Sequence, residues 1–348
     1  MTQSCLLEHA ADFPAPSAPP SAAPSTPEAG AIGATEALAT GVYFLKGATR
    51  YFHEGAKTGP AGAIQSLMCN NGWVDLGDEL LLIDANMPGR ADSFLTEVRK
   101  TSNKPIRFLV NTHHHGDHIY GNRPIYERTG ATIVSCSEMI EELRRYETGT
   151  FGGAPGRWEQ VAKLRPDVAA TPILCPTLTY ERRLVIEGSA RRVELLHLAW
   201  GHTRGDTAVW LPEEKVLFTG DLVANGPFNI VRDGEMRQWP EFLERLEALR
   251  PKIVCPGHGE HAGADLLRRQ RIFFQALWAA VEARAGAGAD LPQILGDLDG
   301  VRAALLDDKD AAGHVIPHEA DLPVLSLAAQ VERVFGQLPK GDLLRLAG

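Results

Sequence analysis

The densest cluster of potentially reactive side chains is the run HHHGDH that begins at His113. Directly after an apolar segment typical of a buried strand, it offers four potential metal ligands: His113, His115, Asp117 and His118. In extended backbone, His113 and His115 point to the same side, because side-chain direction repeats every two residues. Gly116 then permits a turn that directs Asp117 and His118 toward a second position. The run therefore predicts a loop that serves two neighbouring metal ions.

Further candidate ligands follow at the ends of predicted strands: His202 in GHTRGD, Asp221 in FTGD and His258 in CPGHG. In layered α/β proteins such loops converge at one edge of the sheets, where catalytic residues concentrate. Imidazole nitrogens and carboxylate oxygens suit zinc, and also iron or manganese, better than they suit a thiolate-selective metal. The ligand types therefore predict a metal centre but leave the identity of the metal open.

The segments that must position these residues alternate between strand and helix patterns. Apolar runs typical of strands occur between about residues 41 and 258, and helical spacing appears around Phe94 and after Ser137. Before them lies an Ala-, Pro- and Ser-rich segment that cannot bury enough apolar surface to offset the entropy of ordering. We therefore predict three parts: a disordered N-terminal tail at 1–40, a catalytic domain at 41–262 and a helical C-terminal extension at 263–348.

The order of the ligand motifs resembles that of the metallo-β-lactamase superfamily across about residues 41–262. The matching features are HxHxDH, a GHTxGD histidine, an aspartate after a strand and a PGHG histidine. The resemblance implies an α/β fold, an αββα four-layer sandwich, here with a C-terminal helical extension. It also implies a binuclear site, with two Zn²⁺ per chain expected, although iron or manganese would also fit.

The same resemblance implies a role for each ligand. One metal would be held by His113, His115 and His202, and the other by Asp117, His118 and His258. Asp221 would bridge the two ions. A hydroxide shared by both metals would attack the substrate carbonyl, because two cations lower the pKa of bound water. Asp117 would be catalytic as well as a ligand, by orienting the hydroxide and relaying a proton to the leaving group.

Differences between this sequence and individual branches of the family limit the expected substrate. Branches that hydrolyse β-lactams usually carry Cys or Ser at the position of Asp221, and lactonase relatives carry a tyrosine where this chain has Ala224. We expect a hydrolase of a carbonyl linkage: an ester, thioester, lactone or amide. The alternatives are a mononuclear iron oxidoreductase resembling the persulfide dioxygenases, a β-lactamase, and a binding protein without catalytic activity.

Other polar residues near the motifs are expected to support the site without touching metal. Asp84, which ends the strand LLLID, is expected to steady the HxHxDH loop, as outer carboxylates commonly do in metal sites. Asp206 is expected to fix the GHTRGD loop through local hydrogen bonds. His114 should face away from its two neighbours if the backbone is extended, so it is not a predicted ligand.

Composition limits the partners and the location of the protein. A net charge of −9 argues against nucleic-acid binding, so the expected partner is a small-molecule substrate. The five cysteines are scattered and suggest neither a disulfide framework nor a structural zinc knot. The first residues lack the pattern of a signal peptide, and no apolar run is long enough for a membrane helix. We therefore expect a cytoplasmic protein with no membrane partner, in which the C-terminal helices could mediate a homodimer.

Overall fold

The computed structural model describes residues 33–47, 68–150, 153–316 and 325–339. Its strands form two sheets that face each other. The first sheet, in spatial order, contains β1 (Thr35–Ala39), β2 (Val42–Leu45), β3 (Asn71–Asp75), β4 (Leu80–Ile83), β5 (Ile106–Val110), β6 (Thr132–Cys136) and β7 (Leu178–Tyr180). The second contains β12 (Ile253–His258), β11 (Val216–Ala224), β10 (Ala208–Leu211), β9 (Arg192–Leu196) and β8 (Arg183–Glu187).

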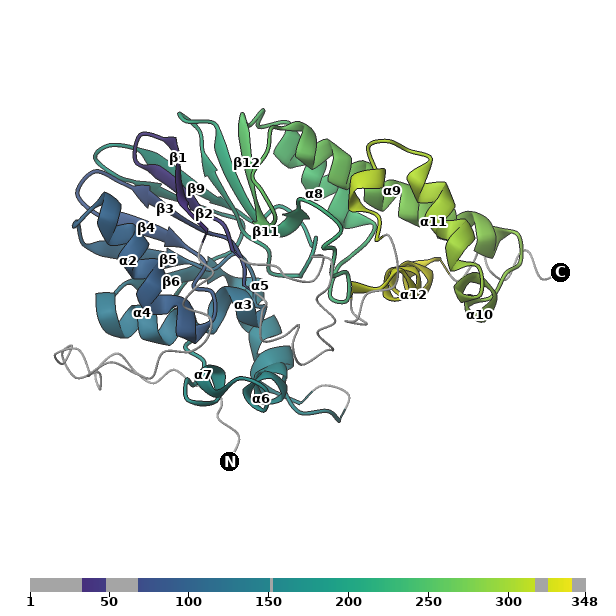
Figure 1. Cartoon of the computed structure of the whole chain (residues 1–348), viewed down its shortest axis with the longest axis horizontal. Helices are drawn as coiled ribbons and strands as arrows, with labels where there is room; N and C mark the ends of the chain where they lie inside the picture. Colours follow the sequence, from purple (N-terminus) through teal and green to yellow (C-terminus); the bar gives the residue numbers. More distant parts are fainter. Residues whose placement is uncertain (1–32, 48–67, 151–152, 317–324, 340–348) are drawn as a thin grey trace.

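Helices cover both outer faces of this pair of sheets (Figure 1). Those of the first half are α2 (Ala91–Thr101), α3 (Gly116–Ile119), α4 (Asn122–Thr129), α5 (Ser137–Glu142), α6 (Arg157–Ala162) and α7 (Pro166–Ala169), with a 3₁₀ turn at Pro88–Arg90 and a π-helix at Leu143–Thr148. Those of the second half are α8 (Gln238–Glu247), α9 (Asp265–Gly286), α10 (Leu291–Leu295), α11 (Leu298–Leu306) and α12 (Leu327–Gln337), with a 3₁₀ turn at Ala312–His314.

The side chains of the strands alternate between two apolar layers, as the period of a β-strand requires. In β4, Leu80 and Leu82 pack with Phe94 of α2 in the outer layer, whereas Leu81 faces the layer between the sheets. In β10, Val209 faces that same inner layer. A third layer joins the second sheet to α8, α9 and α12. Three apolar layers separate four layers of structure, two of strands and two of helices, which defines an αββα sandwich, so the predicted fold class and the helical C-terminal extension are confirmed.

One boundary of the predicted organisation is wrong. Thr35–Ala39 fall within the segment predicted to be a disordered tail, yet they form β1 and pair antiparallel with β2. The backbone hydrogen bonds of this pairing need no apolar pattern, so an Ala-rich composition conceals such a strand. Residues 1–32 of the predicted tail lie outside the described residues.

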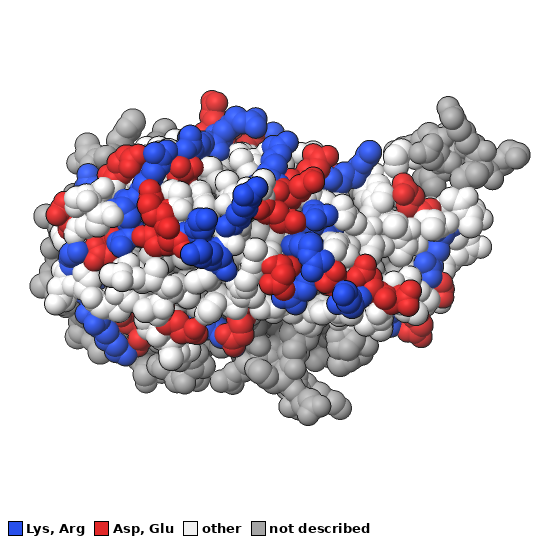
Figure 2. Space-filling model, turned by 90° about the horizontal axis from the view of Figure 1, so that it is seen from above, with Lys and Arg blue, Asp and Glu red and all other residues white. Residues whose placement is uncertain are grey.

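The described surface and cysteines add three observations. Figure 2 shows Lys and Arg interspersed with Asp and Glu on one face of the molecule. Cys69, Cys136 and Cys255 are buried free thiols. Within the described ranges, no helix is both long and apolar enough to span a bilayer.

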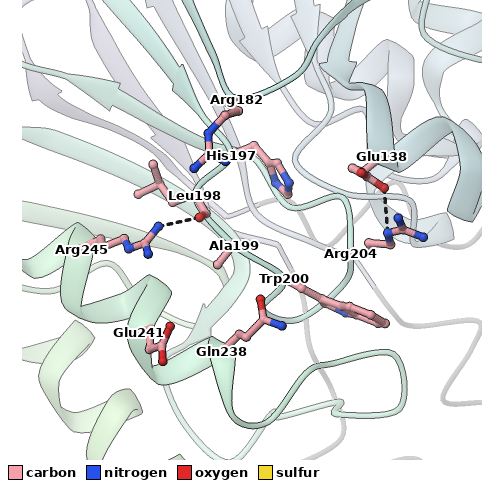
Figure 3. Close-up of a pocket in the computed structure, with 10 residues that line it drawn as sticks. All are labelled: Glu138, Arg182, His197, Leu198, Ala199, Trp200, Arg204, Gln238, Glu241 and Arg245. Carbon is pink, nitrogen blue, oxygen red and sulfur yellow. Dashed lines mark hydrogen bonds and ion pairs between the residues drawn. The ribbon is translucent and has the colours of Figure 1, made fainter.

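A surface pocket of about 420 Å³ lies beside the loop between β9 and β10 (Figure 3). His197 and Trp200 of that loop form one wall, and α8 contributes Arg245, whose guanidinium donates a 2.8 Å hydrogen bond to the carbonyl of Leu198. As far as the structure describes the chain, the lining contains no predicted metal ligand. The predicted ligands therefore lie outside this pocket.

Candidate metal centre

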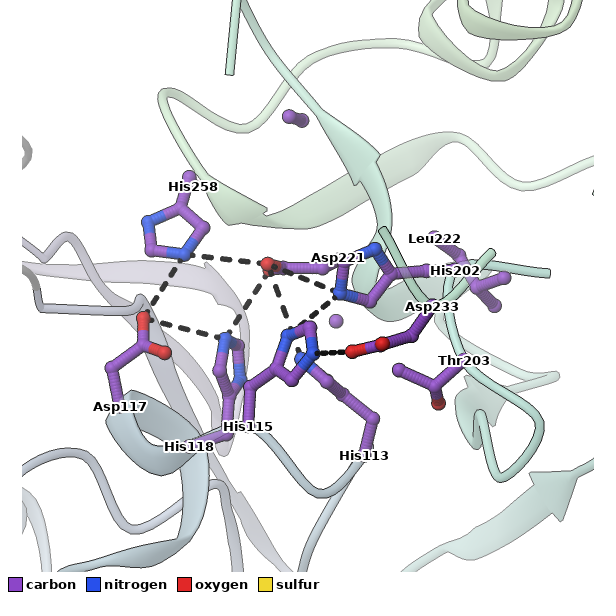
Figure 4. A network of polar contacts seen from close by, with 12 residues as sticks. His113, His115, Asp117, His118, His202, Thr203, Asp221, Leu222, Asp233 and His258 are labelled. Atoms are coloured by element: carbon purple, nitrogen blue, oxygen red, sulfur yellow. Dashed lines mark hydrogen bonds and ion pairs between the residues drawn. The ribbon is translucent and has the colours of Figure 1, made fainter. Parts of the chain in front are cut away.

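The seven predicted ligands come from both sheets and meet at one edge of the sandwich. His113 and His115 follow β5, and α3 presents Asp117 and His118. The second sheet contributes His202 from the loop after β9, Asp221 and His258. Figure 4 shows all seven side chains directed toward one another, with the Asp221 carboxylate between two groups of histidines. The sequence-predicted convergence of the loops is thus present in the structure.

Two groups of ligand atoms are each compact enough to hold one ion. Within each group the atoms lie within 4.8 Å of one another. The first group consists of His113, His115, His202 and Asp221. The second group consists of Asp117, His118 and His258. These are the groups that the family resemblance implies, with Asp221 assigned to the first.

The Asp221 carboxylate reaches both groups. Its Oδ1 lies 3.2 Å from Nε2 of His118, in the second group, and its Oδ2 lies 3.7 Å from Nε2 of His202, in the first. Oδ2 also lies 3.5 Å from Nε2 of His258. One carboxylate facing two groups of imidazoles has the geometry of a bridging ligand. Asp221 lies inside β11, not beyond it as the sequence suggested, at a point where the pairing of β11 with β12 is irregular.

Two glycines make room for this arrangement. A Cβ on Gly257 would lie 1.9 Å from Oδ1 of Asp221, so only glycine permits β12 to approach that carboxylate. A Cβ on Gly116 would lie 2.2 Å from the ring of Tyr120. Gly116 has no positive φ. Its role is therefore close packing at the start of α3, and not the unusual turn conformation that we predicted.

The ligand atoms fit metal ions because they are buried and face one another, in some cases as close as 3.2 Å, without forming well-aligned hydrogen bonds. Among the described residues, no hydrogen-bond partner is found for five of them: Nε2 of His113, His118 and His258, Oδ2 of Asp117 and Oδ1 of Asp221. A buried polar atom without a partner is strongly destabilising, and native proteins avoid it. Five such atoms facing one small region therefore indicate that cations belong there.

The electrostatics of the cluster favour positive charge at its centre. Burial opposes the charge on His258, but the carboxylates of Asp221 and Asp117 raise its pKa to about 9. Burial and the neighbouring His115 lower the pKa of His202 to about 3. Against the effect of burial, His258 and His118 hold the pKa of Asp221 well below its usual value. The carboxylates thus attract positive charge, which bound metal would supply in place of the protons.

Asp84 lies behind the second group of ligands. Its Oδ2 accepts a hydrogen bond of 2.8 Å from Nδ1 of His118, which leaves Nε2 of that ring facing Asp221. Thr112 donates to the same carboxylate from its backbone N–H and from its hydroxyl, both at 2.8 Å. Asp84 adopts a left-handed conformation with φ of 59°. These contacts match the supporting position that the sequence predicted.

Asp206 closes the GHTRGD loop on itself. Its carboxylate accepts hydrogen bonds from the backbone N–H of Thr203 at 2.9 Å and from the Thr203 hydroxyl at 2.7 Å. Burial raises the pKa of Asp206 to about 8, and these hydrogen bonds oppose that rise. The side chain lies beside the residue that follows His202, in the local arrangement expected from the sequence.

Asp233 is a residue of the site that the sequence did not reveal. Its Oδ2 accepts a 2.9 Å hydrogen bond from Nε2 of His115, so Nδ1 of that ring faces His202, whose Nε2 lies 3.0 Å away. Arg157 of α6 pairs with the same carboxylate at 2.7 Å. His114, which is fully buried, lies 3.8 Å from it and forms with His115 and Asp233 a further compact group of potential ligands. No motif surrounds Asp233 in IVRDGE, so only the three-dimensional structure identifies it.

Replacing Asp233 with asparagine is expected to weaken zinc binding by about 10- to 100-fold, the usual effect of losing a residue that orients a histidine ligand. The amide cannot accept from His115 and Arg157 with the same charge, so the imidazole loses its fixed orientation. Isothermal titration of the metal-free protein measures the change. Asp167→Asn is the matched control, because Asp167 also pairs with an arginine, Arg165 at 2.8 Å, but contacts no predicted ligand. Equal affinities for the two variants would refute the role of Asp233.

Comparison with known proteins agrees with the fold and identifies the family. A sequence model of the Metallo-beta-lactamase superfamily matches residues 65–258, which is more than half of the chain. The chain therefore belongs to the metallo-β-lactamase superfamily, and the predicted family is confirmed. Among solved structures, a metallo-β-lactamase from Hirschia baltica superposes with a TM-score of 0.52 at 19% identity, covering 69% of this chain and 96% of that one.

Individual relatives are distant and carry different names. A metallo-beta-lactamase type 2 from Bacteroides fragilis is 29% identical over 84 residues, 23% of this chain and 34% of the relative. A hydroxyacylglutathione hydrolase from Methylococcus capsulatus is 29% identical over 158 residues, 45% of this chain and 50% of the relative. A linear primary-alkylsulfatase from a Pseudomonas strain is 24% identical over 216 residues, 54% and 40% respectively. The chain matches half or less of the length of these three relatives.

Proposed function

We propose that the protein is a binuclear zinc hydrolase that cleaves a carbonyl linkage in a small molecule: an ester, thioester, lactone or amide. The observation that carries the proposal is the set of five buried ligand atoms that lack hydrogen-bond partners among the described residues and face one region. Two metal ions bound there would lower the pKa of a water molecule and polarise the substrate carbonyl. His113, His115 and His202 would hold one ion, Asp117, His118 and His258 the other, and Asp221 both.

The remaining roles in this proposal belong to carboxylates of the chain. Oδ2 of Asp117 lies 3.2 Å from Nε2 of His258 and 3.7 Å from Nε2 of His118, at the edge of the second group. From there it could accept a proton from the attacking water and return it to the leaving group. Asp84 would orient His118, and Asp233 would orient His115, through the hydrogen bonds described above. The chain thus supplies both ligands and a proton carrier.

The presence of a full second group supports a hydrolase with two ions over the mononuclear iron alternative. A β-lactamase is the less favoured hydrolase, because Asp221 occupies the position of the Cys or Ser usual in those enzymes. Relatives named hydroxyacylglutathione hydrolase and alkylsulfatase add a glutathione thioester and an alkyl sulfate to the substrates worth testing. Cytoplasmic location, a small-molecule partner and a homodimer through the C-terminal helices stay predictions.

The first experiment is the metal content of the purified protein, produced without added metal and measured by plasma mass spectrometry. The proposal expects two zinc ions per chain, and then hydrolysis of at least one member of a panel of esters, thioesters, lactones, amides, a β-lactam and an alkyl sulfate. One iron per chain, with oxygen consumed in the presence of a persulfide, would replace the proposal with the oxidoreductase alternative. Asp78→Ala, a substitution at an exposed turn, serves as the control for preparation and folding.

A further inference from the structure

The loop of residues 225–237, between β11 and α8, carries Asp233 but has little regular structure of its own. Two of its backbone hydrogen bonds are internal, from Phe228 N–H to the carbonyl of Gly226 at 2.9 Å and from Gly234 N–H to the carbonyl of Val231 at 3.0 Å. Another, from Glu235 N–H, reaches the carbonyl of Gly201 at 2.9 Å. A loop with few internal bonds takes its position from whatever packs against it.

Helix α12, near the end of the described chain, packs against this loop with one polar face. Gln330, Arg333 and Gln337 are spaced i, i+3 and i+7, which places them on the same side of the helix. Nε2 of Gln330 donates to the carbonyl of Asn229 at 3.2 Å. The spacing and this contact show that the polar face of α12 is directed at the backbone of the loop.

The strongest of these contacts meet at Gly234, the residue next to Asp233. The Gly234 carbonyl accepts from Nε of Arg333 at 2.8 Å and from Nε2 of Gln337 at 3.0 Å. The amide oxygen of Gln337 in turn accepts from the backbone N–H of Met236 at 2.8 Å. One side chain therefore holds the loop on both sides of Glu235, through a donor and an acceptor.

Helix α9 holds the start of the same loop. The side-chain amide of Gln270 donates to Oδ1 of Asn229 and accepts from the backbone N–H of Ala224 at 3.3 Å. Gln270 and Gln330 are both 0% exposed. A buried amide is destabilising unless it is hydrogen-bonded, so the loop and the two helices depend on each other for these bonds.

The contacts of Gly234 and its neighbours fix the position of Asp233, which touches the candidate metal centre. Trp200 holds Asp233 from one side: the indole N–H of Trp200 donates a 2.8 Å hydrogen bond to the backbone carbonyl of Asp233. From the other side, Gly234 is fixed by α12 as described. The Asp233 carboxylate then lies 2.9 Å from Nε2 of His115. A shift of Gly234 would move this carboxylate and release the orientation of a predicted ligand.

We infer that Gln337 is a positioning residue of the metal centre, and that the C-terminal helices are required for full metal affinity because α12 fixes the loop that carries Asp233. This inference rests on the proposed function, since it needs His115 to bind metal. A purely structural role for the same contacts predicts something different: a lower thermal midpoint, with unchanged metal affinity in the folded protein.

The test compares Gln337→Leu with the full-length wild type and with Glu332→Gln, an exposed position on the same helix. Zinc affinity is measured at a temperature where all variants are folded, by competition with a chromophoric chelator. Hydrogen exchange of the 225–237 loop is followed by mass spectrometry. We expect Gln337→Leu to weaken zinc binding by about tenfold, the lower end of the effect of residues that orient ligands, and to speed exchange in the loop. Glu332→Gln should change neither.

Two further variants separate the outcomes. Gln337→Glu keeps the acceptor for Met236 but loses the donor to Gly234, so an intermediate affinity is expected. Arg333→Gln, which loses the other donor to Gly234, replaces Gln337→Leu if that variant does not fold. Wild-type zinc affinity in Gln337→Leu, together with weakened affinity in Asp233→Asn, would overturn the inference and leave the proposed function intact. A wild type that binds no zinc would overturn the proposed function itself.

Discussion

Replacing Asp221 with alanine is expected to lower kcat/KM by at least about three orders of magnitude while the protein stays folded. The Asp221 carboxylate faces both ligand groups, 3.2 Å from His118 and 3.7 Å from His202. Its loss removes a ligand from each proposed ion. Stabilisation of transition-state charge by metal ions is worth several kcal/mol, and about 1.4 kcal/mol corresponds to a tenfold change in rate. The measurement is kcat/KM on whichever substrate the panel identifies.

Metal content and folding must be measured on the same Asp221→Ala preparation. Zinc per chain is expected to fall below two, whereas the circular dichroism spectrum should match that of the wild type, because alanine fits the space between β11 and β12. Asp78→Ala controls for the loss of an aspartate elsewhere, at an exposed turn. Full activity in Asp221→Ala would contradict the binuclear scheme, since no other carboxylate in the described cluster faces both groups.

The parts of the fold that the sequence predicted are those encoded by local patterns. The continuous apolar run LLLI predicted the strand β4, and helical spacing around Phe94 predicted the helix α2. The ligands were also found locally, because their motifs gather several ligand types within a few residues. Even Asp84 was recognisable, as a carboxylate at the end of a buried strand.

The parts that the sequence did not reveal depend on contacts between distant segments. Asp233 lies 118 positions from His115, and Gln337 lies 101 positions from Met236. Neither Asp233 nor Gln337 belongs to a recognisable motif. β1 was missed for a related reason: its pairing with β2 uses backbone atoms, which an Ala-rich composition does not indicate. The role of Gly116 was also misjudged, because the Tyr120 ring that packs against it is a steric constraint seen only in the fold.

Removing the metal ions is expected to abolish activity and to lower the thermal midpoint by roughly 5–10 °C. A ligand at 100 times its dissociation constant stabilises the folded state by about 2.7 kcal/mol, so two ions contribute about 5.4 kcal/mol, and each kcal/mol shifts the midpoint of a chain of this size by about 1.4 °C. The physical reason is that buried ligand atoms, such as Nε2 of His113 and Oδ2 of Asp117, have no hydrogen-bond partner among the described residues. Without cations they stay unsatisfied, which destabilises the folded state.

The measurement is a pair of thermal melts, before and after exhaustive treatment with a chelator, followed by addition of zinc. Re-added zinc should restore both the midpoint and the activity, because the ligands are held by the fold and not created by the metal. Asp221→Ala supplies the matched comparison: with the shared carboxylate absent, chelation should shift its midpoint much less than that of the wild type. A wild-type midpoint and activity that survive chelation unchanged would show that the buried cluster holds protons and not metal, as the raised pKa of His258, about 9, would then permit.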